Sequence, residues 1–416
     1  MDDPRDAVKD HTELSRRFFF QLGAAGAAAW NASPLAAGDA GTDALLAEAI
    51  SKLEYLTPLD RVKPIGRGNP PPSKLPPEKL REVGLHPDTW FLEVVPDPES
   101  NSKVDRPLSR ELGTAFDWKG LMRLAEKSAV RYMHVCTCTN VPDPLHMCLW
   151  EGVPVREVIW MTGPSANVRR VCYWGYHNSE SKRFQSSLAP SQILETPPGE
   201  MPVILAYKMN GQPIPGPLGG PVRLIVPGSH GNRSIKWLQH MVLTNEFKAS
   251  DSYAEANNDV ESPLKTCARF ISAPKEVRAG QPAALTGLAQ VGISGLSKVQ
   301  YAVHAAGRFA DDPNVAKADW REAKILPPPK DWGGGVARGK LPEAPMQVNP
   351  ATGQPYLWPI RYALVHWAAL LPALPAGEYE VCCRTIDANG IAQPMPRPWP
   401  KTGMNAIQRA VLPVRG

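Results

Sequence analysis

Prolines interrupt this chain along its whole length and restrict what it can fold into. It contains 45 prolines among 416 residues, about twice the usual share. Proline lacks a backbone donor and breaks the interior of a helix, and 33 glycines add further turn positions. The sequence therefore predicts short strands joined by many turns, and not a helical bundle.

The length and a change of pattern near residue 260 predict two domains. A chain of this size exceeds what one hydrophobic core usually supports. We expect a signal or mobile N-terminal segment over 1–40, a mixed α/β domain over 45–258 and an antiparallel β-sandwich over 259–416. Short apolar strands at about ten-residue spacing predict the sandwich, which a Pro/Gly-rich insertion at 326–355 interrupts. The predicted fold class is α+β.

Hydrophobic periodicity places helices and strands within the first domain. Apolar residues at helical spacing predict helices at 45–57, 117–127 and 153–161. The pair Asn210-Gly211 predicts a tight hairpin turn. Runs rich in β-branched and apolar residues predict strands at 89–96, 129–139, 168–174, 202–215, 220–228 and 235–245.

One short run concentrates residue types that bind metals. Residues 134–155, HVCTCTNVPDPLHMCLWEGVPV, hold three of the seven cysteines and two of the nine histidines. Structural zinc normally uses pairs of the C-x2–4-C kind, which the C-x-C and H-x-C spacings here match poorly. The odd number and irregular spacing of cysteines predict no disulfide framework. One interpretation of this run is nevertheless a zinc or copper site, built from His134, Cys136, Cys138, His146 and Cys148.

The N-terminus resembles a twin-arginine export signal. Arg16 and Arg17 directly precede the apolar stretch FFFQLGAAGAAAW, which leads into small residues. Five acidic residues before the arginines depart from the usual positive segment. We predict export to the periplasm, without a membrane span, because no apolar run reaches about 20 residues. The net charge of +5 is diffuse and predicts no nucleic-acid partner.

Three motifs, in this order, resemble the sulfite oxidase family of molybdenum–pterin enzymes. The first is a cysteine at a strand end followed by LWEGVPVREVI. The second is VILAYKMNGQPIP with GGPVRLIVPGSHGNRSIKWLQHMVL, and the third is KVQYAVH with LPAGEYEVCCRTIDANGIAQP. The resemblance spans roughly 55–416. It implies a molybdopterin-binding catalytic domain over 45–258 and an immunoglobulin-like dimerisation domain over 259–416.

The resemblance also implies that one cysteine thiolate ligates molybdenum beside the pterin sulfurs, and a soft thiolate suits such a metal. Strand alternation places Cys136 and Cys138 on the same face. We favour Cys138, because with Thr139 and Asn140 it resembles a shortened form of the family's Cys-x-Gly-Asn turn. Cys136 is the alternative ligand, and otherwise a small buried hydrophobic residue.

Further site residues follow from the same resemblance. Arg67 and Asn69, in GRGNPPP, match a cofactor-contacting segment imperfectly. Arg223 corresponds to an active-site or cofactor arginine, whose planar fork suits an oxyanion, and Tyr253 lies where the family has a tyrosine near the substrate. The loop GSHGNRSIKW is expected to bind the pterin phosphate through backbone amides and cations. Its expected contact residues are Gly228, Gly231, Arg233, Ser234 and Lys236.

Three positions depart from the family pattern. Leu218 and Asn69 stand where the family usually has histidines, and Lys208 replaces a common glutamate. The expected fold accommodates these changes. They make a catalytically inactive pterin-binding protein an alternative.

The implied activity is oxidation of sulfite to sulfate by oxo transfer at molybdenum. The chain has no C-x-x-C-H motif for a c-type haem and no expected b-type haem domain, so a separate acceptor such as cytochrome c is expected to take the electrons. A homodimer through the C-terminal domain is expected. The alternative activity is reduction of an S-oxide, such as oxidised methionine, on the same scaffold.

Overall fold

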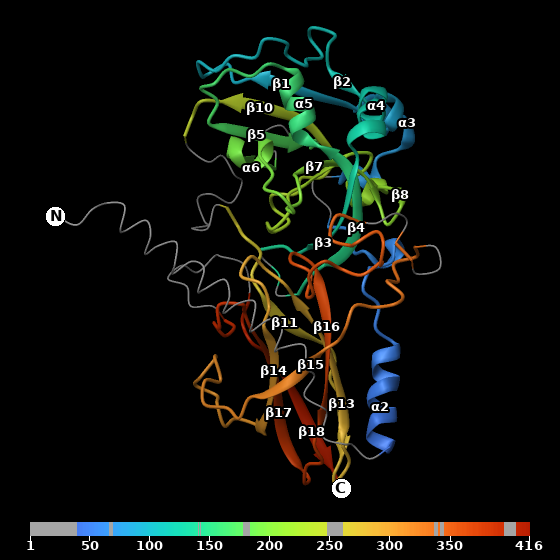
Figure 1. The fold of residues 1–416 in the computed structure, drawn as a ribbon, viewed down its shortest axis with the longest axis vertical. Helices are drawn as coiled ribbons and strands as arrows, with labels where there is room; N and C mark the ends of the chain where they lie inside the picture. The colour runs from blue at the N-terminus through green and yellow to red at the C-terminus, as the bar shows by residue number, and fades with distance from the viewer. Residues whose placement is uncertain are drawn as a thin grey trace, which may run out of the picture. The chain divides into compact units, whose positions relative to one another are not determined.

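A computed structural model shows how the chain folds (Figure 1). Residues 48–416 form one compact unit, separate from Met1–Ala47. The predicted export signal and the predicted domain boundary at 258 lie outside the described residues. The structure describes residues 40–65, 70–139, 141, 143–177, 184–247, 261–336, 340–341, 345–394 and 405–416.

Helices in these ranges are short, as the proline content predicts. Asp117 caps the second predicted helix, because its side chain accepts a hydrogen bond of 2.7 Å from the Gly120 N–H. The first predicted helix ends at Ser51 and not at residue 57, and the chain then buries Tyr55 and Leu56 in a hydrophobic cluster. The α-helices are α2 (Ala40–Ser51), α3 (Pro77–Glu82), α4 (Trp118–Ser128), α5 (Val155–Met161) and α6 (Pro190–Leu194). Single 3-10 turns lie at Leu59–Arg61, Pro72–Lys74, Pro87–Thr89 and Gly216–Leu218.

The first sheet of the N-terminal domain has the strand order β2-β1-β10-β5-β6. β1 and β10 pair in parallel, and the other pairs are antiparallel. The predicted strands at 89–96, 168–174 and 235–245 are confirmed within a few residues. The strands are β1 (Phe91–Pro96), β2 (Phe116–Asp117), β5 (Arg170–Gly175), β6 (Gln185–Leu188) and β10 (Leu238–Thr244).

The second sheet has the order β3-β4-β7-β8, with β9 paired to β7. The predicted hairpin turn is confirmed, since Asn210 and Gly211 both have positive φ, 51° and 78°. The sequence did not predict β4, although every residue of this strand is buried. The strands are β3 (Val130–Cys136), β4 (His146–Pro154), β7 (Ile204–Met209), β8 (Gln212–Pro213) and β9 (Arg223–Ile225).

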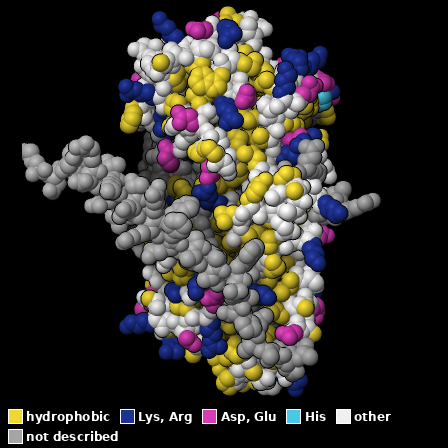
Figure 2. All heavy atoms as spheres, in the orientation of Figure 1, with side chains coloured by type: hydrophobic (Ala, Val, Ile, Leu, Met, Phe, Trp, Pro, Cys, Tyr) yellow, Lys and Arg dark blue, Asp and Glu magenta, His cyan; other side chains and the backbone are white. Residues whose placement is uncertain are grey.

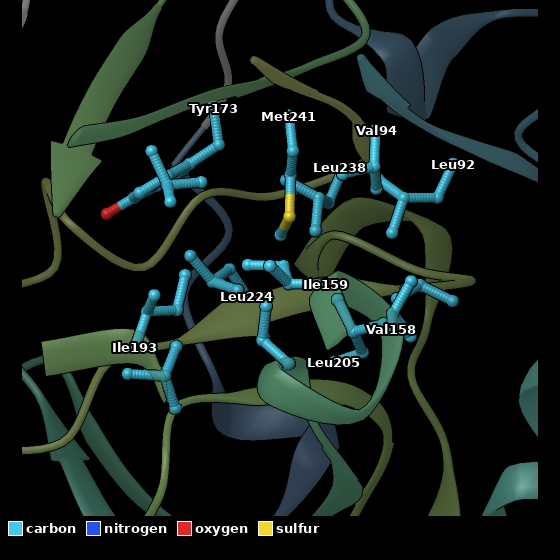
Figure 3. Packing of buried hydrophobic residues seen from close by; sticks show 14 of the residues in the cluster. Leu92, Val94, Val158, Ile159, Tyr173, Ile193, Leu205, Leu224, Leu238 and Met241 are labelled. Atoms are coloured by element: carbon cyan, nitrogen blue, oxygen red, sulfur yellow. The ribbon is translucent and has the colours of Figure 1, made fainter. Parts of the chain in front are cut away.

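The two sheets share one hydrophobic core (Figure 3). Side chains of β1, β5 and β10, among them Met241, face those of α5, β7 and β9, among them Ile159 and Leu224. Helix α5 begins directly after β4. The LWEGVPVREV motif therefore runs from the second sheet into a helix whose side chains join the shared core.

Gly152 in this motif allows β4 and β7 to approach each other. A Cβ atom at Gly152 would lie 2.5 Å from the carbonyl oxygen of Leu205 on β7, which is closer than real Cβ atoms come. The pairing register of the two strands also shifts between Glu151 and Gly152. The motif requires glycine here because β7 occupies the space of a side chain.

The C-terminal part is one curled sheet of eight strands, in the order β11-β13-β16-β15-β14-β17-β18-β12. β11 also contacts β17 and β18, so the sheet closes over a core that includes Trp367 and Val381. The antiparallel prediction is correct for all pairs except β12 with β18. The strands are β11 (Cys267–Ser272), β12 (Val277–Arg278), β13 (Ala283–Gln290), β14 (Lys298–Ala305), β15 (Arg321–Ile325), β16 (Leu364–Leu371), β17 (Gly377–Ile386) and β18 (Gln408–Arg415).

The predicted sandwich differs from this sheet in one respect. Strand β15 pairs with both β14 and β16, so the hydrogen-bonded ladder continues where a sandwich would have two separate sheets. The immunoglobulin-like description stays a prediction.

The insertion at 326–355 contributes buried apolar side chains to the core, although its composition is polar. Trp332, Val336 and Val348 are buried in a cluster that also contains residues of β3 and β4. Gln347 pairs with the backbone of Met133 on β3, accepting from its N–H at 3.0 Å and donating to its carbonyl oxygen at 2.7 Å. The insertion therefore covers the edge of β3.

The surface carries charges of both signs. On the face drawn in Figure 2, basic and acidic side chains are interspersed, in keeping with the net charge of +5. None of the helices in the described ranges has the length and apolar character needed to cross a membrane.

Candidate functional site

One cavity brings together half of the site residues predicted from the sequence. Its wall is formed by the end of β3, the loop between β9 and β10, and the residues that follow β5. Leu218, which stands where the family usually has histidine, lies in the same wall. The predicted residues that line the cavity are Cys136, Cys138, Arg223, Gly231, Ser234 and Lys236.

Six predicted residues are not placed in this cavity. Arg67, Asn69, Asn140 and Tyr253 lie outside the described residues. The other two are Gly228 and Arg233, which contact residues outside the cavity lining.

Gly228 and Arg233 make internal contacts. The Gly228 N–H donates to Nε2 of His134 at 3.1 Å, and the fully buried Arg233 pairs with Glu261 at 3.0 Å. Glu261 follows 28 positions after Arg233 in the chain, so the sequence did not predict this ion pair.

A close backbone approach holds the loop between β9 and β10 against the end of β3. The Gly231 N–H donates to the carbonyl oxygen of Thr137 at 2.6 Å. A Cβ atom at Gly231 would lie 3.2 Å from that oxygen, so a larger residue would push the loop away. The contact places Ser234 and Lys236 in the same cavity wall as Cys138.

The two candidate cysteines differ in their surroundings. Cys136 is the last residue of β3 and packs in a hydrophobic cluster with Tyr132 and Trp150. Burial raises the pKa of the Cys136 thiol, although the positive charges of Arg223 and Lys236 oppose this shift. Cys138 lies beyond the end of the strand and is partly exposed. Both thiols reach one cavity, in agreement with the alternation argument.

Arg223 is fixed in the cavity wall. Its guanidinium donates to the carbonyl oxygens of Leu218 at 2.9 Å and Ser234 at 3.2 Å. It also lies over the ring of Trp150, 5.0 Å from the ring centroid. Its Nε atom is buried and has no hydrogen-bond partner in the part of the chain that the structure describes. The Nε donor of this buried cation therefore remains for a bound ligand.

The cavity is positive. Lys63, Arg223 and Lys236 line it, and its described lining includes no carboxylate. Lys236 is anchored by a hydrogen bond of 2.9 Å from Nζ to the carbonyl oxygen of Ile65. Such a wall favours an anionic ligand.

Two further polar residues in the wall, His146 and Asn232, were not predicted to contact the cofactor, and His146 was named only as a candidate ligand of the zinc or copper site. His146 on β4 is buried, and neither ring nitrogen has a hydrogen-bond partner among the described residues. The same holds for Oδ1 of Asn232. Burial lowers the pKa of His146 to about 3, with Arg223, Lys236 and His134 adding to the shift, so the ring is neutral. The signal for His146 was its place opposite Cys136, which becomes visible only once β4 is recognised.

The zinc or copper site considered from the sequence is not assembled. Within the described ranges, only His304, Glu380 and Cys382 form a group of three or more metal-binding side chains within reach of one ion. His134 uses Nε2 to accept from Gly228. All seven cysteines, each of them in a described range, are free thiols.

Lys208, which replaces the glutamate common in the family, has a partner on the neighbouring strand. Its Nζ lies 2.9 Å from Oε1 of Glu151 on β4, which also accepts from the Tyr207 hydroxyl at 2.9 Å. Arg131 binds the other oxygen of Glu151 at 2.6 Å. Burial would raise the pKa of Glu151, but these three hydrogen bonds outweigh it and hold that pKa below its usual value. The substitution at 208 thus belongs to a local ion-pair network outside the cavity lining.

Comparisons with known proteins agree with the motif assignment. Residues 82–253 match the family model described as oxidoreductase molybdopterin binding domain. The NADPH nitrate reductase of Fusarium oxysporum is 34% identical over 105 residues, which cover 25% of this chain and 11% of that protein. The inducible NADH nitrate reductase 1 of Glycine max is 30% identical over 118 residues, covering 27% and 13%. The match thus spans little more than a tenth of these relatives.

A solved structure shares the fold over a longer part of the chain. It is the sulfane dehydrogenase SoxCD from Paracoccus pantotrophus, with a TM-score of 0.54 and 18% sequence identity. The superposition covers 79% of this chain and 76% of that chain. The likeness therefore extends beyond residues 82–253 into the C-terminal sheet.

Proposed function

Because residues 82–253 belong to the family of molybdopterin-binding oxidoreductase domains, we propose that the protein is a molybdenum-dependent oxidoreductase that oxidises sulfite to sulfate. The observation that carries this proposal is the cavity in which two thiols and three cations converge. A soft protein ligand suits a sulfur-coordinated metal, and fixed positive charge suits a sulfite dianion.

The cavity wall fits a molybdenum–pterin cofactor in its chemistry. Buried polar atoms normally have partners, and Nε of Arg223, Oδ1 of Asn232 and both ring nitrogens of His146 have none among the described residues. A polar ligand in the cavity would supply these partners. When bound, the cofactor supplies two-electron oxygen-atom transfer.

We assign the metal ligand to Cys138. Its thiol is partly exposed to the cavity, whereas Cys136 packs among hydrophobic side chains. Forming a thiolate in that cluster carries a larger desolvation cost. Cys136 then serves as a small hydrophobic residue of β3, which is the role that its burial supports.

The cations of the wall hold and orient the substrate in this proposal. Arg223 is fixed by two backbone carbonyls, so its charge is already in place before the substrate arrives. Lys63 and Lys236 line the same space and add attraction for an anion. The roles of Arg67, Asn69, Asn140 and Tyr253 are carried over from the family resemblance alone.

The cellular setting is part of the same proposal. The Arg16-Arg17 signal supports export to the periplasm. Electrons would pass to a separate acceptor such as cytochrome c, and the C-terminal sheet, proposed to be immunoglobulin-like, would support a homodimer. The names of the similar proteins support a second candidate, reduction of nitrate, beside the S-oxide reduction considered from the sequence.

The direction of turnover tests the proposal. Purified protein is assayed for sulfite-driven reduction of cytochrome c, and in parallel for viologen-driven reduction of methionine sulfoxide and of nitrate. We expect turnover with sulfite, and a fall of about 10- to 100-fold in kcat/KM in Lys236→Met, since a charge contact to the anion is lost. Lys103→Met, outside the cavity lining, is the control. Turnover only with a sulfoxide or nitrate would overturn the sulfite assignment, and molybdenum-loaded protein without any turnover would support an inactive pterin-binding protein.

A further inference from the structure

A second cluster of metal-binding side chains lies in the C-terminal sheet, outside the cavity described above. We propose that His304, Glu380 and Cys382 bind one thiophilic d10 metal ion, and that this ion is Cu(I). The proposal is independent of the molybdenum site, because all three side chains lie on β14 and β17, outside the cavity lining. It assigns the chain a second metal centre.

The strand register brings the three side chains to one point. His304 on β14 lies directly opposite Glu380 on β17, and Cys382 follows Glu380 by two positions, on the same face of the strand. Nε2 of His304 lies 3.6 Å from Sγ of Cys382 and 3.7 Å from Oε2 of Glu380. Metal–ligand bonds of about 2.0–2.3 Å at trigonal or tetrahedral angles place ligand atoms roughly 3.3–4.0 Å apart. The cluster is therefore already close to the spacing of a metal site.

The histidine presents a lone pair to this point. Its Nδ1 lies 3.1 Å from the carbonyl oxygen of Ala305, which can only accept, so Nδ1 carries the proton. Nε2 is then the acceptor nitrogen. Metal-binding histidines commonly donate their other N–H to a carbonyl in this way, which fixes the tautomer. Three side-chain atoms with lone pairs therefore converge on one point: Nε2 of His304, a carboxylate oxygen of Glu380 and Sγ of Cys382. The thiol gives up its proton when a metal ion binds.

The fourth group in the cluster favours a monovalent ion. Arg409 pairs with Oε2 of Glu380 at 2.6 Å, and this ion pair is neutral as a whole. If a monovalent cation replaces the Cys382 thiol proton, the net charge of the buried cluster stays the same. A divalent ion would leave one uncompensated charge there, which is costly. Cu(I) is the monovalent d10 ion that prefers thiolate and imidazole ligands.

The surroundings exclude water from the thiol. Cys382 is fully buried beside Val315 and Ile407, and the ring of Phe309 lies edge-on to His304, 4.8 Å between centroids. Each Cu(I) bound releases one proton to solvent, as the S–H bond is replaced by an S–Cu bond.

The test is an anaerobic titration of full-length, cofactor-loaded protein with Cu(I) buffered by bicinchoninate. The variants are Cys382→Ser and His304→Gln, and the matched control is Cys383→Ser. Cys383 is the next residue and is equally buried, but it packs in the core on the other face of the sheet. We expect wild type and Cys383→Ser to bind one more equivalent of Cu(I) than Cys382→Ser, with affinity at least 100-fold weaker in His304→Gln. Calorimetry in two buffers should show one proton released.

Equal stoichiometry and affinity in all four proteins would overturn the proposal and leave the cluster as a hydrogen-bonded network. Zinc bound in preference to Cu(I), in a parallel titration, would overturn the charge argument and the choice of ion. If Cys382→Ser does not fold, His304→Gln and Glu380→Gln carry the test, since both keep the buried thiol.

Discussion

Cys136 and His146 lie directly opposite each other on β3 and β4, and both line the same cavity. One antiparallel hairpin thus supplies a thiol and a neutral imidazole to the wall, and Cys138 extends the first strand into it. Every residue of β4, the second strand of this hairpin, is buried. The candidate site is therefore built on a rigid element, which favours precise positioning of a bound group.

His146 should matter for ligand binding and not for folding. Its two ring nitrogens lack partners in the described structure, and a buried polar atom without a partner costs about 1–3 kcal/mol. His146→Phe should therefore leave the cofactor-free protein as stable as wild type or more stable, while retention of the cofactor falls. Thermal unfolding of both forms and molybdenum content measure this. A loss of more than about 2 kcal/mol in the cofactor-free protein would show instead that His146 is structural.

Glu151 should stabilise the fold in a pH-dependent way. Its carboxylate accepts from Arg131, Lys208 and Tyr207, which hold its pKa below the usual value. Its stabilisation is present above the unfolded-state pKa of about 4.3 and is lost as the pH falls through the lower folded-state value. Lys208 is partly exposed, so solvent weakens its ion pair with Glu151. We therefore expect Glu151→Gln to lower the free energy of unfolding by only about 1–3 kcal/mol at pH 7.

Urea unfolding at pH 7 and pH 3 checks the Glu151 prediction, since the cost should shrink at the lower pH. Glu157→Gln is the control, because Glu157 pairs with Arg156 at 3.4 Å near the surface. That variant should lose less than about 0.5 kcal/mol. Equal losses in the two variants would argue against the network.

His366 should make stability fall as the solution becomes acidic. Burial on β16 lowers its pKa to about 4, against about 6.5 in an unfolded chain. Between these values the unfolded state binds a proton that the folded state does not, so the free energy of unfolding falls by up to about 1.4 kcal/mol per pH unit. His366→Phe should remove this contribution in cofactor-free protein. Urea unfolding between pH 6.5 and 4.5 measures the slope, and an unchanged slope would contradict a neutral buried His366.

Local patterns in the sequence predicted the parts of the fold that depend on neighbouring residues. The Asp117 cap and the Asn210-Gly211 turn are confirmed, because capping and turn formation involve residues close in the chain. The motifs likewise predicted Cys138, Arg223 and Lys236 as site residues, and all three line one cavity. These are the features that short stretches encode.

Contacts between distant segments account for what the sequence did not predict. Strand β4 was missed because Gly152 and Pro154 interrupt its strand pattern, and the glycine is required by β7. Arg233 was expected at the cofactor, but it pairs with Glu261. The insertion at 326–355 reads as polar, yet Trp332 is buried against the first domain's strands. None of these partners is visible from local sequence.

Elemental analysis of purified protein, wild type beside Cys138→Ser and Cys136→Ser, tests the central claim most directly. The account predicts about one molybdenum per chain in wild type and in Cys136→Ser. It predicts loss of molybdenum in Cys138→Ser, because the soft ligand is removed. Loss in Cys136→Ser alone would contradict the ligand assignment and move it by two residues. Wild-type protein that binds no molybdenum would contradict the proposed function itself.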